Sequence, residues 1–383
     1  MQMIRSRRSA LALGCTLALG ACLAGGLSAC GGAPAQGSAS GSASGSAPAA
    51  EEQKTVLFTD SAGREVEVPA VIDKVVPSGH TATQVLLTIA PDKLAGVSQE
   101  LSESQQKYLG HALDEELPVL GAAFGSKGNL NKEAVAATGA QILIDTGEYK
   151  EGIAEELDEL QEQLGIPCVF IESKLDEWGD AYRTLGDLLG EPERGEELAS
   201  YCEDAYAQVN DVMQGIPASE RARVVYCVGD AGTNVIANGS FQANVVDMLA
   251  DNVAVVDAPS SKGSGNEVSV EQIAAWDPEV VLFGALNGSV TPYGTVASDA
   301  AWSALPAIQN GSYYEVPSEP YGWLNNPPTV NQVLGMQWLA RVLYPTQFEG
   351  MGGEADVVRE YFQVVYDYEL TDAELAEFGV EAK

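Results

Sequence analysis

The chain has 383 residues, a length that accommodates two domains of ordinary size. Its 55 acidic residues far outnumber its 20 basic ones, and this negative charge disfavours nucleic acid and anionic membrane surfaces as partners. The sequence contains only two histidines, His80 and His111, which argues against a multi-histidine zinc site and against a Ser–His–Asp centre.

The N-terminus has the pattern of a secretory signal. A basic stretch, Arg5–Arg8, precedes the uncharged run Ala10–Leu27, and small residues then lead to Cys30. The stretch resembles a bacterial lipobox, so we expect a signal peptide over residues 1–29 and a diacylated Cys30. Residues 30–54 are rich in Gly, Ser and Ala and predict a flexible tether. A single-pass membrane anchor is the alternative, although four glycines dilute the apolar run.

Along the rest of the chain, short apolar runs alternate with helical patterns. An edge hairpin is predicted over Thr55–Val68, and the alternation that follows is typical of a doubly wound parallel sheet. The longest helical pattern, Glu193–Met213, separates two such series. We therefore expect an α/β fold with two Rossmann-like lobes and mostly parallel sheets, in three parts: an N-terminal lobe at 55–190, a long connecting helix at 191–215 and a C-terminal lobe at 216–383.

A helix–strand unit occurs twice in the sequence. The stretch NKEAVAATGAQILID at 131–145 aligns without a gap with SVEQIAAWDPEVVLF at 269–283. Each copy predicts a short helix, a turn and a strand that is buried on both faces. Glu133 and Glu271 fall on the same position, either as ordinary exposed acids of two similar lobes or as acids presented symmetrically to a partner.

The loops that follow the predicted strands are the candidate binding site, because ligands of open α/β sheets bind beyond the carboxyl ends of the strands. These loops are rich in aromatic, amide and hydroxyl side chains, which suit stacking on a bulky ligand and hydrogen bonding to it. Aromatic side chains that merely cover the sheet edge are the alternative. The candidate ligand-binding residues are His80, Phe124, Lys127, Tyr149, Lys262, Tyr293, Tyr321, Trp323 and Asn325.

The charged and nucleophilic candidates are few. Lys127 and Lys262 are either counter-charges for an anionic chelate or solvated loop lysines. His80 is a ligand contact, a metal ligand or a loop histidine with an ordinary hydrogen bond. The sequence has neither a GxSxG elbow nor a GxxxxGK[ST] phosphate loop, so we propose no catalytic residue. Three further cysteines show no metal-ligand spacing and no unique disulfide pairing: Cys168, Cys202 and Cys227.

Several motifs in this order carry a resemblance to a known family. They are FTDSAGREVEVP at 58–69, NLNKEAVAATGAQILI at 129–144, VSVEQIAAWDPEVVLF at 268–283 and AWSALPAIQNGSYYEVP at 301–317. The chain resembles ABC-transporter substrate-binding proteins of the iron-siderophore/cobalamin/haem class, which is class III of the periplasmic binding proteins. The resemblance implies two lobes joined by one long helix, little domain closure, and docking of Glu133 and Glu271 onto arginines of the membrane permease.

The resemblance implies a monomeric, lipid-anchored protein outside the cytoplasm that is not an enzyme and has no cofactor or metal of its own. We expect it to capture an iron chelate (a siderophore), haem or a corrinoid and to deliver it to an ABC permease. The absence of an arginine cluster from the proposed loops argues against a highly anionic siderophore. A carrier of molybdate, tungstate or another metal or oxyanion is the alternative. The stretch GWLNNPPTVNQ at 322–332 is similar to relatives that handle iron chelates or oxyanions such as molybdate. A secreted α/β enzyme is a third, less favoured hypothesis.

Overall fold

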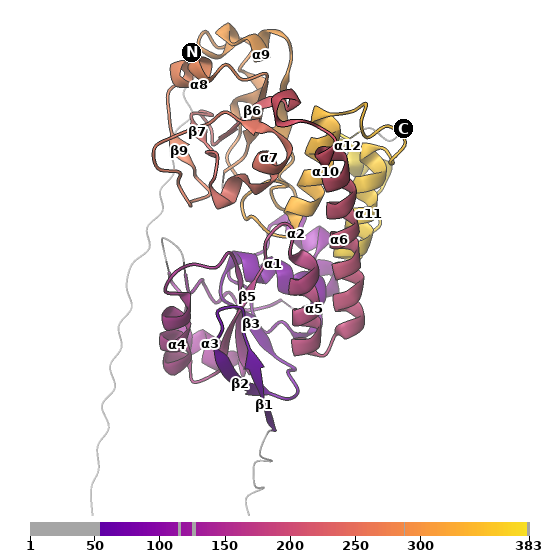
Figure 1. The fold of residues 1–383 in the computed structure, drawn as a ribbon. Coiled ribbons are helices and arrows are strands. Elements are labelled where there is room, and N and C mark those ends of the chain that lie inside the picture. The colour runs from indigo at the N-terminus through magenta and orange to yellow at the C-terminus, as the bar shows by residue number, and fades with distance from the viewer. Residues whose placement is uncertain (1–53, 114–115, 125–127, 287, 381–383) are drawn as a thin grey trace, which may run out of the picture. The chain divides into compact units, whose positions relative to one another are not determined.

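Two β-sheets organise the chain, one in each half of the sequence (Figure 1). The computed structural model describes four stretches: residues 54–113, 116–124, 128–286 and 288–380. The expected signal peptide, Cys30 and Lys127 lie outside these residues. Within the four stretches, no helix combines the length and the apolar character that crossing a membrane requires.

The first sheet is parallel, with strand order β3-β4-β5, and its strands are Val75–Pro77, Ile142–Gly147 and Cys168–Glu172. Single parallel bridges from Val75 to Leu94 and from Val97 to Val119 extend it. Leu94, Val97 and Val119 therefore contribute isolated bridges rather than full strands. We call this sheet and the helices that cover it the first lobe.

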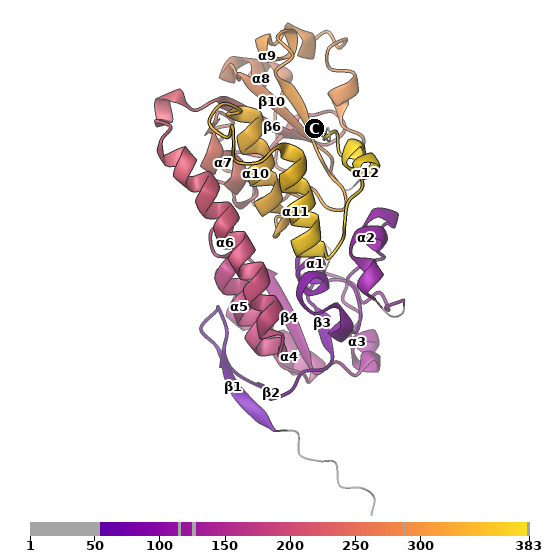
Figure 2. The ribbon, with the colours of Figure 1, turned by 90° about the vertical axis from the view of Figure 1, so that its right-hand side faces the viewer.

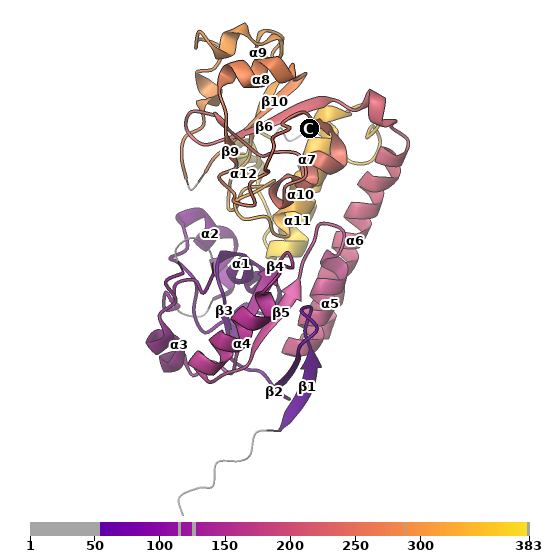
Figure 3. The ribbon, with the colours of Figure 1, turned by 60° about the vertical axis from the view of Figure 1, so that its left-hand side comes forward.

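Alternate residues of β4 enter two different cores, as expected for a strand buried on both faces. Leu143 packs in the core that includes α4, whereas Ile142 and Ile144 pack in the core that includes α1 and α5. Figure 3 shows α3 and α4 on one side of the first sheet and α5 on the other. The doubly wound arrangement predicted from the sequence is confirmed for this lobe.

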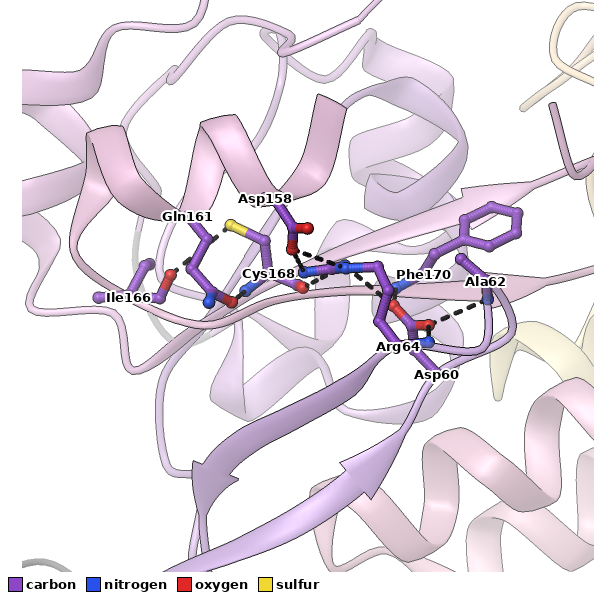
Figure 4. Close-up of polar contacts among 8 residues, drawn as sticks. All are labelled: Asp60, Ala62, Arg64, Asp158, Gln161, Ile166, Cys168 and Phe170. Carbon is purple, nitrogen blue, oxygen red and sulfur yellow. Dashed lines mark hydrogen bonds and ion pairs between the residues drawn. The ribbon is translucent and has the colours of Figure 1, made fainter. Parts of the chain in front are cut away.

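The predicted hairpin is formed by β1 (Thr55–Thr59) and β2 (Glu65–Pro69), which pair antiparallel. A buried aspartate anchors it to the first sheet (Figure 4). Asp60 accepts hydrogen bonds from the backbone of Phe170 in β5, at 3.2 Å, and from the Nη1 of Arg64, at 3.0 Å. The same Arg64 nitrogen donates to the carbonyl oxygen of Cys168, at 3.0 Å. Asp60 and Arg64 therefore both attach the hairpin to β5.

The second sheet has strand order β11-β10-β6-β7-β9, and β8 pairs with β6 outside that path. The β8–β6, β6–β10 and β10–β11 pairs are parallel, whereas β7 pairs antiparallel with β6 and with β9. We call this sheet and its helices the second lobe. Its strands are β6 (Arg223–Val228), β7 (Asn234–Val235), β8 (Asp251–Asn252), β9 (Asn266–Glu267), β10 (Val280–Gly284) and β11 (Tyr313–Val316).

Twelve α-helices lie within the described residues. They are α1 (His80–Ile89), α2 (Glu103–Tyr108), α3 (Lys132–Thr138), α4 (Ile153–Leu164), α5 (Trp178–Leu189), α6 (Pro192–Gln214), α7 (Asn244–Leu249), α8 (Val270–Trp276), α9 (Pro306–Gln309), α10 (Asn331–Leu343), α11 (Glu354–Tyr366) and α12 (Asp372–Glu377).

The expected long helix is α6, with 23 residues. It packs on α5 of the first lobe and on α10 and α11 of the second, as Figure 2 shows. Its buried stripe includes Leu198, Cys202 and Val209, which are spaced by about one or two helical turns. The helix therefore contacts both lobes with one apolar face.

The repeated sequence unit forms the same structure twice, as α3–β4 and as α8–β10. The side chains of Asn131 and Ser269 cap the two helices by accepting a backbone hydrogen bond, at 3.0 and 3.2 Å. Each helix ends at a left-handed residue, Gly139 or Asp277, as the predicted turns require. The two helices are therefore equivalent from cap to cap.

Candidate ligand-binding site

A cavity of about 520 Å³ takes its walls from both lobes. The first lobe contributes a histidine and the polar residues around α2, and the second contributes loops that follow β10 and β11. This is the place where open α/β sheets bind ligands. A second hollow, of about 880 Å³, is lined by residues between Val97 and Val119 alone and lies outside this space. The residues around the cavity are His80, Gln99, Ser102, Gln105, Gln242, Gly263, Ala285, Gly288, Ser318, Glu319, Pro320, Tyr321, Gly322, Asn326, Pro327 and Pro328.

His80 is the first residue of α1, rather than part of the preceding loop as the sequence suggested. Its Nδ1 lies 3.0 Å from the hydroxyl of Ser98, and that hydroxyl lies 2.9 Å from the hydroxyl of Thr83. This arrangement leaves Nε2 for a ligand. Burial by the surrounding loops lowers the pKa of His80, so the imidazole is neutral at neutral pH and suited to donate a lone pair.

Two neighbouring asparagines join loops of the second lobe, and of the two Asn326 lines the cavity whereas the predicted Asn325 does not. Asn325 is buried, and its Nδ2 donates to the carbonyl oxygen of Gly263, at 3.3 Å. The Nδ2 of Asn326 donates to the carbonyl oxygen of Ala285, at 3.2 Å. Asn326 has φ of 66°, a left-handed conformation that asparagine tolerates better than most residues. Three separate loops are thereby held together at the cavity wall.

Two predicted aromatic residues on the loop after β11 differ in their role. Tyr321 lines the cavity, and only 6% of it is exposed. Trp323 is fully buried, its Nε1 donates to the carbonyl oxygen of Glu319 at 3.1 Å, and its ring packs edge-on against Trp338 at 6.1 Å. We correct the prediction for Trp323 accordingly, because it supports the loop from the core and lies outside the cavity lining.

Four other predicted residues are not brought to the cavity. Tyr149 is 49% exposed, and Tyr293 packs at a tilt against Tyr313 with ring centroids 5.4 Å apart. Phe124 packs against the core of the first lobe. Lys262 is exposed beside Gly263 but does not itself line the cavity. These residue types are the ones expected in a binding loop, but their side chains lie outside the cavity lining.

The cavity wall carries little charge. Among the described lining residues there is one carboxylate, Glu319, and neither lysine nor arginine. The described residues contain no group of three or more His, Cys, Asp or Glu side chains that could hold a metal ion. Of the lining residues that the structure describes, only His80 and Glu319 carry donors that bind metals strongly, so a bare cation would find few ligands among them.

One of the residues that line the cavity has a buried acceptor atom without a partner. Gln242 is 8% exposed, and its Nε2 donates to the carbonyl oxygen of Ser261, at 3.2 Å. Its Oε1 is buried and has no hydrogen-bond partner among the described residues. An unpaired buried acceptor costs about 1–3 kcal/mol.

An ionisable side chain lies under the strand ends of the first lobe. Asp145, near the end of β4, accepts a hydrogen bond from the hydroxyl of Ser78. Burial raises the pKa of Asp145 to about 6, although the Ser78 hydrogen bond and the charge of Lys150 oppose this shift. Ser78 precedes Gly79 and His80 in the chain, and Asp145 itself is not among the residues that line the cavity.

Sequence reasoning missed the polar residues of α2, although a signal for them exists. Ser102 and Gln105 form a capping box, in which each side chain accepts from the other's backbone nitrogen, at 3.1 Å. The S-x-x-Q pattern could have placed the start of this helix. The pattern does not show which residues of the helix face the cavity, because that depends on how the helix packs.

Glu133 and Glu271 occupy the same position, the second residue of α3 and of α8, and both are exposed. Hydrogen bonds from its own backbone and from Ser269 lower the pKa of Glu271, so it is ionised. Neither residue is near the cavity lining. They form a pair of equivalent surface carboxylates, one on each lobe.

The cavity between two α/β lobes agrees with a family match over most of the chain. Residues 79–320 match the family model described as "Periplasmic binding protein". The chain belongs to the periplasmic binding protein family. The family match covers β4 and β5 of the first sheet, α6 and the second sheet, and it ends within the loop after β11.

Individual relatives of this periplasmic binding protein have different ligands. The molybdate-binding protein MolA of Haemophilus influenzae is 23% identical and matches 81% of this chain and 90% of its own length. The Fe(3+)-citrate-binding protein YfmC of Bacillus subtilis is 22% identical and matches 55% of this chain and 62% of its own length. A solved ABC transporter solute-binding protein from Sulfurospirillum deleyianum is 27% identical, with a TM-score of 0.75 over 85% of this chain and 99% of that one. The protein is therefore similar to solute-binding components of ABC transporters.

Proposed function

We propose that this protein is the lipid-anchored, extracytoplasmic binding component of an ABC importer for a small metal chelate. The observation that carries the proposal is the cavity of about 520 Å³ between the two lobes, which is lined by one neutral imidazole and several uncharged polar side chains. Its volume lies within the range of about 300–1,000 Å³ that is typical of small-molecule sites. The chelate brings most of the metal ligands, and His80 supplies one more through Nε2.

The charge of the cavity lining favours ligands of low net charge among those expected from the sequence. A haem carries two carboxylates and a catecholate siderophore carries several negative charges, and both call for cationic partners. The described lining offers none, and it contains the carboxylate of Glu319. We therefore favour a compact chelate of low net charge, such as a one-to-one ferric hydroxycarboxylate complex, over haem or a siderophore of high charge.

Molybdate or tungstate is the second candidate, because the molybdate-binding relative matches 81% of this chain. Neutral donors such as the amides of Gln105 and Asn326 are able to bind an oxyanion. The size argues for the chelate: four oxygens at about 30 Å³ each fill roughly 120 Å³, a small part of the 520 Å³ available.

Delivery to the permease is assigned to the two equivalent carboxylates, Glu133 and Glu271. Each lies in the first turn of a short helix, exposed and on a different lobe. A permease with two symmetric halves would place one arginine opposite each of them, as the family resemblance implies. Lipidation of Cys30, with residues 31–54 as a tether, would keep the protein near its permease.

Native mass spectrometry of the full chain purified from its own organism tests the ligand class. We expect an adduct whose mass and isotope pattern include a transition metal and an organic chelator. Titration with ferric citrate and, separately, with molybdate then distinguishes the two candidates. An adduct with neither metal nor oxyanion, together with failure of both titrations, would falsify the proposed function. Lipidation is tested by membrane fractionation of Cys30→Ala, which should release the protein from the membrane.

A further inference from the structure

The short helix α2 forms one wall of the cavity and also joins the two lobes. Ser102, its cap, and Gln105, in its first turn, both line the cavity. The Nε2 of Gln105, which is 8% exposed, donates to the carbonyl oxygen of Pro320 in the second lobe, at 3.2 Å. The position of α2 therefore determines where Ser102 and Gln105 lie in the cavity wall and whether Gln105 contacts Pro320.

A helix of six residues does not hold its own position. Isolated helices shorter than about 12–15 residues are marginal in water, so α2 depends on tertiary packing for its stability and orientation. The capping box fixes its first turn but makes no contact with another element. The contacts that orient the other end of α2 are therefore decisive for the cavity wall.

That other end is packed against the C-terminal segment of the chain. Tyr108 is 2% exposed, and its ring stands edge-on to Phe362 at 5.2 Å and to Tyr368 at 4.9 Å. A third ring, Phe378, lies 5.9 Å from it. Three aromatic side chains that follow α10 in the sequence thus enclose the last residue of α2, and Figure 2 shows α2 beneath α12.

An ion pair fixes the same contact. The Nζ of Lys107 lies 2.7 Å from Oε1 of Glu374, a carboxylate that is largely buried. Tyr368 donates its hydroxyl to the same oxygen, at 2.8 Å, and Thr371 donates both its backbone nitrogen and its hydroxyl to the other oxygen, each at 2.8 Å. The carboxylate of Glu374 thus joins Lys107 of α2 to Tyr368 and to Thr371, the cap of α12.

We propose that Lys107, Tyr108 and Glu374 are positioning residues of the ligand site, through which the C-terminal segment Tyr368–Phe378 holds α2 against the cavity. This inference rests on the proposed function of the cavity. The segment lies beyond residue 320, where the match to the family model ends, so it is a support that the matched region does not contain. A ligand site needs such a support, since polar groups bind well only when packing holds them in place.

Lys107 and Glu374 both remain charged over the pH range in which binding is measured. Burial opposes ionisation of Glu374, but hydrogen bonds from Lys107 and Thr371 outweigh it and lower its pKa to about 2. The hydrogen bond to Glu374 raises the pKa of Lys107. The contact between α2 and α12 is therefore independent of pH from about 4 upward, unlike the protonation of His80.

Lys107→Met tests the positioning role, because methionine keeps the apolar stem and removes the charge. The control is Lys93→Met: Lys93 also pairs with a partly buried glutamate, Glu191 at 3.0 Å, but neither residue lines the cavity. Two measurements are made on the full chain: amide hydrogen exchange of α2 without ligand, and the Kd for ferric citrate and for molybdate.

We expect Lys107→Met to speed exchange at 103–108 by about tenfold and to weaken binding of whichever probe binds by about tenfold, with Lys107→Arg restoring both. Lys93→Met should change neither the exchange of α2 nor the Kd, although it should change Tm by about as much as Lys107→Met does. Unchanged α2 exchange in Lys107→Met, or equal loss of affinity in the two methionine variants, overturns the positioning role. If the wild-type protein binds neither probe, the proposed ligand class fails, while hydrogen exchange alone still decides whether the C-terminal segment holds α2.

Discussion

Gln84 of α1 donates a hydrogen bond from its Nε2 to the Oδ1 of Asn331, the first residue of α10, so two fully buried amides join the lobes. The hydroxyl of Thr329 donates to Oε1 of Gln84, and Tyr361 in α11 donates to Oδ1 of Asn331 at 2.8 Å. Since buried polar groups are costly when unpaired, this network favours one arrangement of the two lobes.

Gln84→Ala should destabilise the protein by about 2–4 kcal/mol, because it leaves a cavity and removes partners of Thr329 and Asn331. Urea denaturation monitored by circular dichroism measures the change. Gln347→Ala, at an exposed glutamine, is the control and should stay within about 0.5 kcal/mol of the wild type. Equal stabilities of the two variants would show that the buried network contributes nothing.

His80→Ala should weaken binding of ferric citrate by about tenfold or more, because it removes the one imidazole that lines the cavity. Tyr149→Ala, on an exposed loop residue outside the cavity, should have no effect. Isothermal titration calorimetry at neutral pH compares the two variants. The assignment of His80 is wrong if both bind like the wild type.

The binding of ferric citrate should also depend on pH through His80. Because burial lowers the pKa of His80, the neutral form that binds a metal persists below the usual value of about 6.5. The Kd is expected to stay constant from pH 8 to about 6.5 and to rise on further acidification. His80→Ala should abolish this rise, and a rise of the same size in the variant would assign the titration to another group.

Asp145→Asn should stabilise the protein at pH 8. The folded-state pKa of about 6 lies above the unfolded value of about 3.9, so folding favours the protonated form, and the stability that this contributes is lost as pH rises through 6. Asparagine avoids the buried charge and should raise the free energy of unfolding by about 1–3 kcal/mol at pH 8. Urea denaturation should show a smaller gain at pH 5. A gain that is equal at both values would mean that ionisation of Asp145 is not the cause.

The double variant Glu133→Ala/Glu271→Ala should bind its ligand normally but support little uptake, because it removes both surface carboxylates assigned to permease docking. Uptake of labelled ferric citrate into proteoliposomes that contain the cognate permease measures delivery, and calorimetry measures binding. A matched control, Glu155→Ala/Glu162→Ala, removes two exposed glutamates of α4. The docking role fails if the two double variants import equally.

Local sequence patterns were sufficient to predict most of the helices and strands. The gap-free repeat predicted α3–β4 and α8–β10, because an N-cap, a helical turn and a buried apolar run depend on neighbouring residues. The spacing of apolar residues predicted the long helix α6 to within about a residue at each end. The equivalence of Glu133 and Glu271 also followed from alignment alone.

The candidate site was only partly predictable. His80 and Tyr321 were identified from loop composition and line the cavity, whereas Trp323 has the same composition cue and lies in the core. The aromatic character of a loop residue does not reveal which way the loop turns. Gln105 and Gln242 were missed because glutamine in a helix or turn carries no signal until packing directs its amide.

The sequence by itself determined the two α/β lobes, their connecting helix and the pair of equivalent surface glutamates, since periodicity and capping are properties of adjacent residues. Only the tertiary structure decided which polar side chains meet at the cavity and what holds them there. Gln105 faces Pro320 from 215 positions away, and Lys107 faces Glu374. Contacts of this range depend on how the two sheets and the C-terminal helices pack together, and no local pattern contains that information.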